Sequence, residues 1–533
     1  MFRRMSIVFT VIILCFSILF TRLLYLSTDN GMMAAAKSQG TATLTVAKER
    51  GNIYDRNYNN LVNEQNRYVA SVNPIPKAVN TIAKQLDEKD REDFLQRINA
   101  GKPLTIELNK SINEEGINTF LLKKRYSDNQ LAAHIIGYTG YDDLGITGIE
   151  KVYNDYLTEQ DAKITVSYPV NAIGSPLTGI EPNIVNTIDN TTQGIMLTLD
   201  KEIQQIAEDA ADKYIEKGAI VIMEVGTGDI VASVSRPTYS PNNIADYIND
   251  ENSPLLNRAF SAYSVGSVFK LVTVSAALEN NISPDFKYEC KGSITVGSNT
   301  FGCHNRAGHG EQNMAEALAH SCNPYFINIG QQIGGDKIYN LAVSLGFGKA
   351  NYFAKDYSSA SGTLPEKDML KGPAVTANFS FGQGELTATP VQICSMVNTI
   401  ASNGEYYTPR LIAGKVDVNK NLIEEPTTPP VQVIPEEITD TVKEFMSEVL
   451  KEGGTGYTAA PYNVIAAGKT ATAQTGVMDG DREIVHSWFG GFFPYIAPQY
   501  AVAIIAEDCE DGKISTCPAF KYIAEKITDL KDK

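Results

Sequence analysis

The hydrophobic pattern begins with a long apolar stretch close to the start of the chain. Residues 5–20 are almost all apolar, apolar residues resume at 23–26, and Arg3 and Arg4 come before them. A helix over residues 5–26 would be about 33 Å long at ~1.5 Å per residue, which is enough to cross a bilayer. Arginines ahead of a span favour the cytoplasmic side. We therefore predict a cytoplasmic stub at residues 1–4, a single-pass transmembrane anchor at 5–26 and an extracytoplasmic body held at the cell membrane.

A cleaved signal peptide is the alternative interpretation of this stretch, with Ala34, Ala35 and Ala36 as the cleavage site. That site lies far beyond the apolar residues, and the apolar stretch is long for a signal peptide. We therefore prefer the uncleaved anchor.

Residues 27–185 show only weak periodicity and are rich in Asn, Lys, Glu and Tyr. They predict a mixed α/β extracytoplasmic domain, with a helix over residues 77–100. The polar, glycine-terminated stretch at 183–194 is typical of a linker. We therefore place one domain at 27–185 and a second at 186–533.

The pattern in the second domain is sharper. Asp200 can cap a helix that runs to about Lys217 and stops at Gly218. Residues 219–225 and 230–235 predict two strands joined by a glycine turn, and residues 463–474, 486–495 and 499–508 predict three more. Residues 519–530 predict a closing helix. Strands at both ends with helices between them predict an α+β domain, in which the two chain ends complete one sheet flanked by helices.

Composition and charge narrow the classes of partner. The 533 residues are 43% hydrophobic and carry a formal net charge of −16, so the chain can bury a large core but repels phosphate backbones. We therefore expect no nucleic-acid partner.

The seven cysteines are scattered, and none forms a CxxC pair. Cys303, His304 and His309 superficially resemble a metal cluster, but no Cys/His spacing fits a structural zinc site, so we expect no metal. Two interpretations stay open for the cysteine pairs 290–303 and 509–517. Each pair either forms a disulfide that closes a loop or consists of two reduced, buried thiols.

Candidate chemistry lies at Ser267 and Lys270, directly behind Gly266. At a spacing of three residues on a helix, the two side chains share one face. Burial beside Val268 and Phe269 would favour a neutral lysine, which can accept the serine proton, while the helix N-terminus presents N–H groups to an oxyanion. Taken alone, the pair is equally compatible with a helix-capping serine and a solvated lysine.

Two further segments can complete this site. Ser321 and Asn323 follow 54 and 56 residues after Ser267, and Lys469 and Thr470 lie on a predicted strand. A hydroxyl and an amide can relay protons and hold a substrate amide, and a cationic lysine at a strand edge can bind a carboxylate. Each segment alone could be a polar turn or an exposed strand residue, but their ordered combination favours a catalytic site.

This set of motifs, serine–lysine, serine–asparagine and lysine–threonine, resembles that of penicillin-binding proteins and serine β-lactamases. Over nearly its whole length the chain is similar to class B penicillin-binding proteins, the monofunctional D,D-transpeptidases of cell division and elongation. The similarity includes the stretches ERGNIYDRNYNNLV (49–62), GITGIEKVYNDYL (145–157) and FSFGQGELTATPVQI (379–393). The resemblance implies a pedestal or dimerisation-like domain at 27–185 and, at 186–533, a transpeptidase domain with an antiparallel sheet flanked by helices.

The resemblance also implies a mechanism and its residues. Ser267 would attack the penultimate carbonyl of a peptidoglycan stem peptide ending in D-Ala-D-Ala, with Lys270 as the base. Ser321 and Asn323 would pass a proton to the leaving D-Ala and position the acyl chain. The terminal carboxylate would bind to Lys469, Thr470 and Thr472, and the oxyanion to the backbone N–H groups of Ser267 and Thr472.

The same resemblance implies that β-lactams acylate Ser267 and that no metal or diffusible cofactor is needed. No glycosyltransferase domain is recognisable in the sequence, so glycan polymerisation implies a membrane glycosyltransferase partner. A membrane-anchored serine β-lactamase is a second enzyme class to consider, although we find no obvious deacylating base.

Three positions depart from the family pattern or add to it. Ala471 stands where glycine is usual, so its methyl could weaken acyl-donor binding, and a catalytically weakened wall-synthesis scaffold is therefore a third hypothesis. Val265 replaces a common proline, which mainly loosens the turn. Cys322, between Ser321 and Asn323, is either a small buried apolar residue or a point of redox control.

Overall fold

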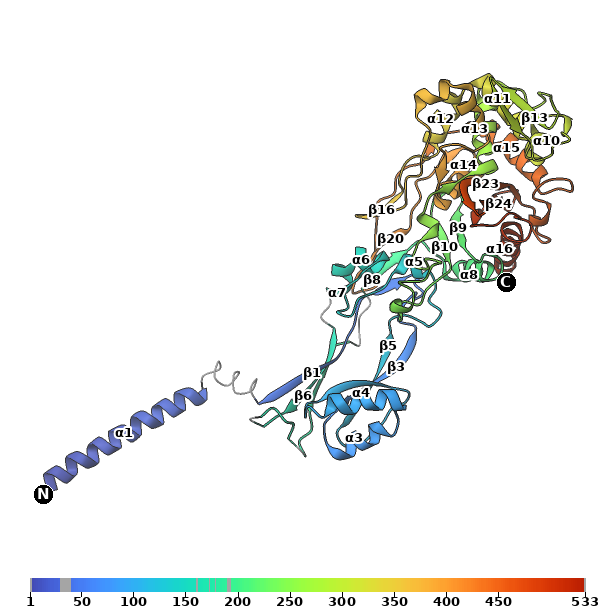
Figure 1. The fold of residues 1–533 in the computed structure, drawn as a ribbon. Helices are drawn as coiled ribbons and strands as arrows, with labels where there is room; N and C mark the ends of the chain where they lie inside the picture. The colour runs from blue at the N-terminus through green and yellow to red at the C-terminus, as the bar shows by residue number, and fades with distance from the viewer. Residues whose placement is uncertain are drawn as a thin grey trace. The chain divides into compact units, whose positions relative to one another are not determined.

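The computed structural model describes residues 2–28, 40–159, 162–171, 173–177, 179–188 and 193–531 (Figure 1). The contacts divide the chain into two compact units. The first contains Met1–Gly51, Asn63–Arg125 and Thr158–Thr191, and the second contains Asn52–Val62, Tyr126–Leu157 and Thr192–Lys533. The division differs from a single boundary at residue 185, because two short N-terminal segments belong to the C-terminal unit.

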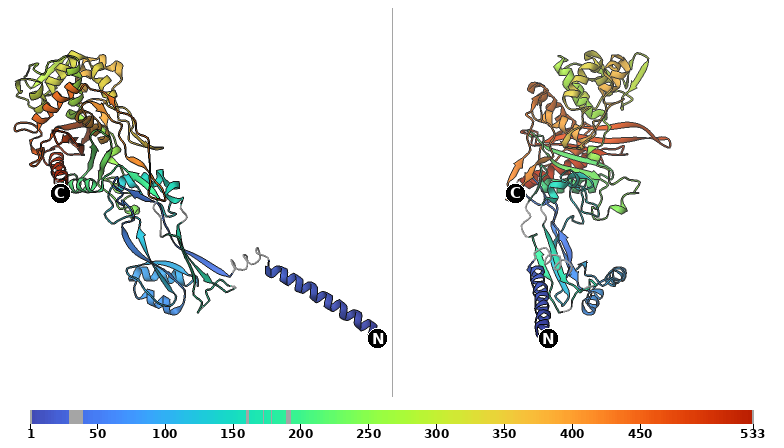
Figure 2. Two further views of the ribbon diagram at one scale, coloured as in Figure 1. Left: turned by 180° about the vertical axis from the view of Figure 1, so that it is seen from behind. Right: turned by 90° about the vertical axis from the view of Figure 1, so that its left-hand side faces the viewer.

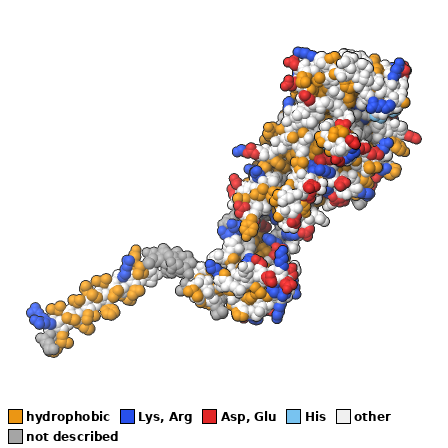
Figure 3. Space-filling model, in the orientation of Figure 1, with side chains coloured by type: hydrophobic (Ala, Val, Ile, Leu, Met, Phe, Trp, Pro, Cys, Tyr) orange, Lys and Arg blue, Asp and Glu red, His pale blue; other side chains and the backbone are white. Residues whose placement is uncertain are grey.

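The first helix, α1 (Phe2–Thr28), covers the predicted anchor. Its most apolar stretch has a mean hydropathy of 2.5 and no buried residue, and hydrophobic side chains cover the helix in Figure 3. Among the described residues it is the one helix long and apolar enough to span a membrane. The alternative cleavage site at 34–36 lies outside the described residues.

The rest of the first unit contains two small sheets. Strands β3 (Gln65–Val72), β4 (Leu104–Leu108) and β5 (Ile117–Lys124) form one sheet, and β1 (Thr41–Lys48), β6 (Lys163–Pro169) and β7 (Asn183–Asn186) form the other. Two helices, α3 (Pro76–Ala83) and α4 (Glu88–Ile98), contribute Ile82 and Phe94 to a core shared with β3.

Two predictions for this unit were only partly correct. The helix predicted over 77–100 is two helices, because Asp87 accepts a hydrogen bond from the N–H of Asp90 and so caps a new helix at Glu88. Part of the predicted linker at 183–194 is the strand β7, which pairs with β6.

The second unit is built on a five-stranded antiparallel sheet in the order β10-β9-β25-β24-β23. Its first strand in sequence, β9 (Gly218–Glu224), pairs with its last, β25 (Tyr500–Ala506), so the two ends of the domain meet as predicted. The others are β10 (Ile230–Arg236), β24 (Arg482–Phe493) and β23 (Ala467–Asp479). β23 lies at one edge, which leaves a row of its backbone groups outside the sheet.

Helices cover both faces of this sheet (Figures 1 and 2). On β24, the Phe489 ring packs 4.4 Å from the Phe520 ring of α16 (Thr516–Lys531), and α16 also packs on α8 (Lys201–Tyr214). A Cβ at the next residue, Gly490, would face Val397 of α14 (Pro390–Ala401). Neighbouring strand residues point to opposite faces, so α16 and α14 lie on opposite sides of the sheet.

The remaining elements of the second unit surround this core. Three short helices, α5 (Ala133–Ile136), α6 (Gly148–Val152) and α7 (Asn154–Thr158), accompany a sheet of β2 (Asn52–Tyr54), β8 (Gly194–Leu197), β20 (Ile412–Val416) and β21 (Leu422–Glu424). The other α-helices described in this unit are α9 (Lys270–Glu279), α10 (Met314–Ala319), α11 (Asn323–Ile333), α12 (Gly335–Ser344), α13 (Pro373–Ser380) and α15 (Glu436–Val449).

The second unit also contains five two-stranded pairs: β12 (Tyr288–Cys290) with β15 (Gly310–Gln312), β13 (Ser293–Val296) with β14 (Asn299–Gly302), β11 (Tyr263–Ser264) with β18 (Thr387–Ala388), β19 (Glu405–Tyr406) with β22 (Val431–Gln432), and β16 (Tyr352–Ala354) with β17 (Tyr357–Ser358).

Candidate active site

The turn that carries Ser267 is held against the edge strand β23. Ser267 lies in a short 3-10 turn over Gly266–Phe269, and α9 begins at Lys270. Gly266 has a φ of 65°, and a Cβ there would lie 3.0 Å from the Thr472 carbonyl oxygen. Only glycine adopts that backbone conformation at so close an approach without strain, so Gly266 fixes the nucleophile turn beside the strand.

A second glycine packs on the same turn from the FSFGQG stretch. The Gly266 N–H donates to the Gly382 carbonyl at 2.9 Å, and a Cβ on Gly382 would lie only 2.0 Å from the Gly266 oxygen. The glycine-rich stretch at 379–384 therefore buttresses the turn from outside the sheet.

Lys270 is fully buried, and its amine contacts the other candidate residues. Its Nζ lies 2.9 Å from the Ser267 Oγ, 2.7 Å from the Asn323 Oδ1, 2.8 Å from the Ser321 carbonyl oxygen and 3.2 Å from the Ser321 Oγ. The structure thus brings together the four side chains that the sequence predicted as catalytic.

The geometry around this amine suits a neutral lysine. The Ser321 carbonyl and the Asn323 Oδ1 can only accept, so they take the two N–H groups of a neutral amine and direct its lone pair toward the hydroxyls. Burial lowers the pKa of Lys270 to about 7 from its usual 10.5. The amine can therefore receive the Ser267 proton near neutral pH.

Ser321 and Asn323 occupy the junction between two helices. Ser321 is buried with a φ of 52°, a conformation that non-glycine residues rarely adopt. Asn323 is the first residue of α11, and its Nδ2 donates to the Gly302 carbonyl at 3.3 Å. The amide is thus oriented with its oxygen toward Lys270.

The lysine–threonine motif on β23 splits between the two faces of the strand. Lys469 is fully buried and donates to the Thr470 carbonyl at 2.9 Å. Burial, and then the positive charge of Lys270, hold the pKa of Lys469 well below its usual value. Thr470 and Thr472 lie on the more open side, and Ala471 is buried. Lys469 is therefore beneath the strand rather than at an exposed edge.

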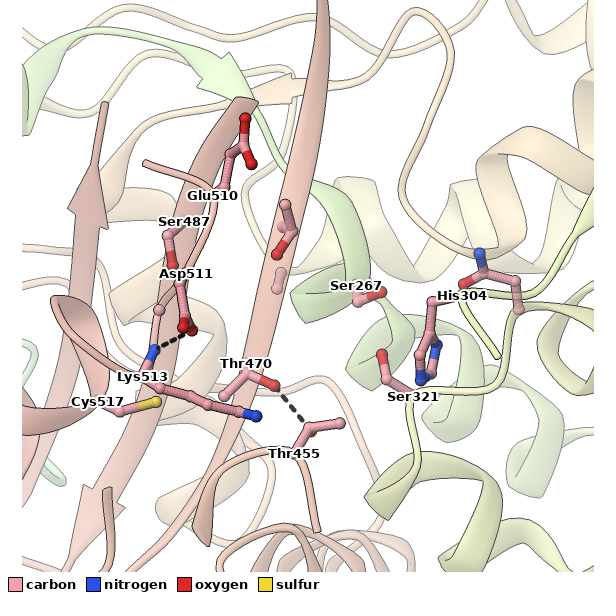
Figure 4. A pocket seen from close by; sticks show the side chains of 14 residues that line it. Ser267, His304, Ser321, Thr455, Thr470, Ser487, Glu510, Asp511, Lys513 and Cys517 are labelled. Carbon is pink, nitrogen blue, oxygen red and sulfur yellow. Dashed lines mark hydrogen bonds between the residues drawn. The ribbon is translucent and has the colours of Figure 1, made fainter. Parts of the chain in front are cut away.

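The Ser267 turn, the Ser321–Asn323 junction and β23 line a solvent-open cavity of about 290 Å³. Figure 4 shows Ser267 and Ser321 across the cavity from Thr470 on β23, with His304 beside them. The lining comprises Ser267, His304, Ser321, Asn323, Thr455, Thr470, Ala471, Thr472, Ser487, Glu510, Asp511, Gly512, Lys513 and Cys517.

Several of these lining residues were missed by sequence reasoning. Thr455 accepts a hydrogen bond from the Thr470 Oγ1 at 2.8 Å and donates through its own N–H to the Ala319 carbonyl at 3.1 Å, which ties β23 to the end of α10. Lys513 brings a positive charge to the cavity from the loop after β25. Neither residue lies in a motif with recognisable chemistry, so no sequence signal would have found them.

All seven cysteines are free thiols. The pairs considered as disulfides, 290–303 and 509–517, are accordingly both reduced. Cys322 is fully buried, and Cys517 reaches the cavity wall.

Two family models cover most of the chain. Residues 218–525 match the penicillin binding protein transpeptidase domain, and residues 45–182 match the penicillin-binding protein dimerisation domain. The chain belongs to the class B penicillin-binding proteins. The resemblance drawn from the motifs is therefore confirmed, as is the predicted fold of an apolar N-terminal helix, a pedestal and a transpeptidase domain.

Similar proteins include two named as peptidoglycan D,D-transpeptidases and one named as a sporulation protein. This penicillin-binding protein is 29% identical to the stage V sporulation protein D of Bacillus subtilis, over 95% of this chain and 82% of that protein. It is 26% identical to the peptidoglycan D,D-transpeptidase MrdA of Haemophilus influenzae (99% and 91% covered) and to FtsI of Escherichia coli K12 (84% and 73%). The transpeptidase function inferred from the motifs agrees with these relatives.

Solved structures share the fold of this class B penicillin-binding protein. A D,D-transpeptidase domain from Eggerthella lenta has a TM-score of 0.65 at 24% identity and covers 91% of this chain and 99% of its own. A Helicobacter pylori complex between penicillin-binding protein PBP2 and MreC has the same TM-score and identity, over 92% and 99%.

Proposed function

We propose that this protein is a serine-type peptidoglycan D,D-transpeptidase in which Ser267 forms the acyl-enzyme. The observation that carries this proposal is the 2.9 Å contact between the Ser267 Oγ and a fully buried Lys270 amine whose N–H groups have two carbonyl acceptors. A serine hydroxyl becomes a nucleophile when a base stands within hydrogen-bond reach.

In the first half-reaction, the Ser267 oxygen attacks the penultimate carbonyl of a stem peptide that ends in D-Ala-D-Ala, and its proton passes to Lys270. The new C–O bond forms as the peptide C–N bond breaks. The Ser321 hydroxyl, 3.2 Å from Lys270, passes that proton to the departing D-Ala nitrogen. An amine from a neighbouring stem then attacks the ester, so that Ser267 recovers its proton and a crosslink results.

Substrate recognition is assigned to β23. Because β23 is an edge strand, its outer N–H and C=O groups can pair with an extended peptide. The Thr472 N–H, with the N–H of Ser267, binds the oxyanion, and the hydroxyls of Thr470 and Thr472 bind the terminal carboxylate. Lys469 supplies positive charge from beneath the strand, and a bound carboxylate would favour its protonated form.

A fluorescent penicillin tests this proposal, because β-lactams present a strained amide to the same nucleophile. The variants are Ser267→Ala and, as the matched control, Ser264→Ala three residues earlier. We expect stable labelling of the wild type and of Ser264→Ala, and none of Ser267→Ala. Rapid loss of label from the wild type would indicate a β-lactamase, and an unlabelled but folded wild type would indicate a scaffold; both results contradict the proposal.

The membrane topology and the partner are part of the same proposal. The uncovered apolar surface of α1 supports a single-pass anchor, with residues 1–4 in the cytoplasm and the transpeptidase domain outside. A membrane glycosyltransferase supplies the glycan strands to be crosslinked. Cysteine-accessibility labelling on intact cells tests the topology: a cysteine introduced at the exposed Asn249 should react with an impermeant maleimide beyond the reaction of the native thiols, which the unmodified protein measures, and no added reaction before lysis would contradict it.

A further inference from the structure

Four side chains next to the active site converge with the geometry of a metal centre. The Sγ atoms of Cys290, Cys303 and Cys322 and a ring nitrogen of His309 all lie within 4.8 Å of one another. The Cys303 Sγ lies 3.5 Å from the His309 Nδ1. The three cysteines are at most 2% exposed, and the His309 ring is partly buried.

The four residues come from separate segments that the fold brings together. Cys290 ends β12, and its register partner on β15 is Gly310, the neighbour of His309. Cys303 follows β14, at the base of the β13–β14 hairpin, and Cys322 directly precedes α11. No short sequence motif spans these segments, which explains why spacing alone predicted no metal site.

The separations suit a tetrahedral ion. With Zn–S of ~2.3 Å and Zn–N of ~2.0 Å, tetrahedral zinc holds two sulfurs about 3.8 Å apart and a sulfur–nitrogen pair about 3.5 Å apart. The 3.5 Å Cys303–His309 contact already matches, and a contraction of about 1.3 Å or less would bring the widest pair into range. Three thiolates and one imidazole are a ligand set that structural zinc prefers. We propose that Cys290, Cys303, His309 and Cys322 bind one structural Zn²⁺ ion.

The surrounding segment needs such a crosslink, because it has almost no core of its own. Across residues 281–311, all of which the structure describes, the buried residues are Cys290, Gly292, Val296 and Cys303. Small units with so little apolar burial are commonly held by disulfides or metal ions. Here two of the four buried residues are the proposed ligands, so zinc would replace the missing core.

The ligand ring is also held in place by its neighbours. A Cβ on Gly308 would lie 2.2 Å from the Cys290 carbonyl oxygen, and the His309 ring stacks on the His320 ring, 5.4 Å away and 9° from parallel. These contacts fix the loop and the ring orientation before an ion binds, which reduces the ordering cost of binding.

The ion would act on catalysis through Cys322. This residue lies between Ser321, in its rarely adopted backbone conformation, and Asn323, whose amide oxygen faces Lys270. A Zn–S bond at Cys322 would hold that junction rigid. Cys322 is thus a positioning residue, and zinc removal should slow acylation of Ser267 rather than only lower the melting temperature.

A disulfide within the cluster is the competing use of these thiols. It would join two sulfurs and leave the third thiol and the imidazole without a function, although all four groups converge. Zinc binding uses all four and displaces the protons of the three thiols to solvent.

The test uses the purified full chain in detergent, with metal content measured by mass spectrometry of the ions. We expect about one zinc per chain. Replacement by Co²⁺ should give sulfur-to-cobalt charge-transfer bands and intense visible bands typical of four-coordinate cobalt. A chelator should remove the ion and slow penicillin acylation by roughly tenfold or more, and added Zn²⁺ should restore the rate.

His309→Ala, Cys303→Ser and the control Cys394→Ser assign the site. Cys394 is equally buried but lies on α14, away from the cluster. Zinc should be lost in the first two variants and retained in the control. A wild type that is acylated by penicillin but binds neither Zn²⁺ nor Co²⁺ would refute the site, as would unchanged zinc in Cys303→Ser or a cluster disulfide found by thiol counting. Metal content is measured independently of acylation, so failure of the proposed reaction would be recognised separately.

Discussion

The proton-accepting role of Lys270 predicts the pH dependence of acylation. The perturbation is pH itself, varied from about 5.5 to 9 over the range in which the free amine titrates. Burial lowers the pKa of Lys270 to about 7, and two carbonyl groups take its N–H groups. Only the neutral amine can accept the Ser267 proton, so the acylation rate should rise as pH rises through this pKa and then level off.

The size of the change in acylation rate follows from the fraction of Lys270 amines that are neutral at each pH. With a pKa of about 7, about a tenth of the amines are neutral at pH 6, half at pH 7 and nine-tenths at pH 8. The rate should therefore increase about tenfold from pH 6 to pH 8 and reach a plateau above. A lysine that titrates at its usual 10.5 would instead give about a hundredfold increase over the same range and no plateau.

The assay measures the second-order rate constant for labelling by a fluorescent penicillin. Reactions are quenched at set times, and the labelled protein is quantified by gel fluorescence. Circular dichroism at each pH controls for unfolding, and Ser267→Ala controls for non-specific label. A flat profile would show that the base does not titrate near neutrality. A hundredfold rise without a plateau would show that Lys270 is protonated throughout, and either result would refute the assignment.

Three substitutions test the strand and the turn. Gly266→Ala should lower stability by about 1–3 kcal/mol and abolish penicillin labelling, because its Cβ would press on the Thr472 carbonyl at a φ of 65°; an unchanged melting temperature would contradict the account. Ala471→Gly should speed acylation by a stem-peptide analogue, since glycine lets an extended peptide approach the β23 backbone more closely, and a slower reaction would contradict this. Thr470→Val removes the 2.8 Å bond to Thr455 and a carboxylate ligand, so it should raise the penicillin concentration for half-maximal rate by roughly tenfold while leaving the plateau rate within about threefold; equal half-maximal concentrations would argue against carboxylate binding there.

Local patterns in the sequence were sufficient to predict the frame of the fold. The local residue pattern alone was enough to predict the helix at 5–26. The same holds for the strands β9, β10, β24 and β25, which are alternating or continuous apolar runs. The meeting of the two ends of the domain was predicted because strands at both ends need hydrogen-bonding partners, and one shared sheet supplies them. The break at Asp87 was missed, since its capping bond competes with a helical periodicity that continues on both sides.

The candidate site was predicted in its residues but not in its geometry. The motifs named Ser267, Lys270, Ser321 and Asn323, but nothing local showed that one amine contacts the other three. Lys469 was predicted on a strand edge, and β23 is an edge strand, but strand alternation turns the Lys469 side chain beneath it, with its Nζ on the Thr470 carbonyl. The sequence placed Cys303 and His309 near each other but led us to expect no metal, because Cys290 and Cys322 join them only through long-range packing.

The central claim is that one hydroxyl, Ser267, forms the covalent bond to the substrate or to a β-lactam. Trypsin should release residues 259–270 as one peptide, since Arg258 and Lys270 flank it, and this peptide also contains Ser261 and Ser264 as internal controls. Tandem mass spectrometry of penicillin-treated protein is predicted to locate the full penicilloyl mass on Ser267 alone. An adduct on another residue, or an unmodified peptide from folded and penicillin-saturated protein, would contradict the account.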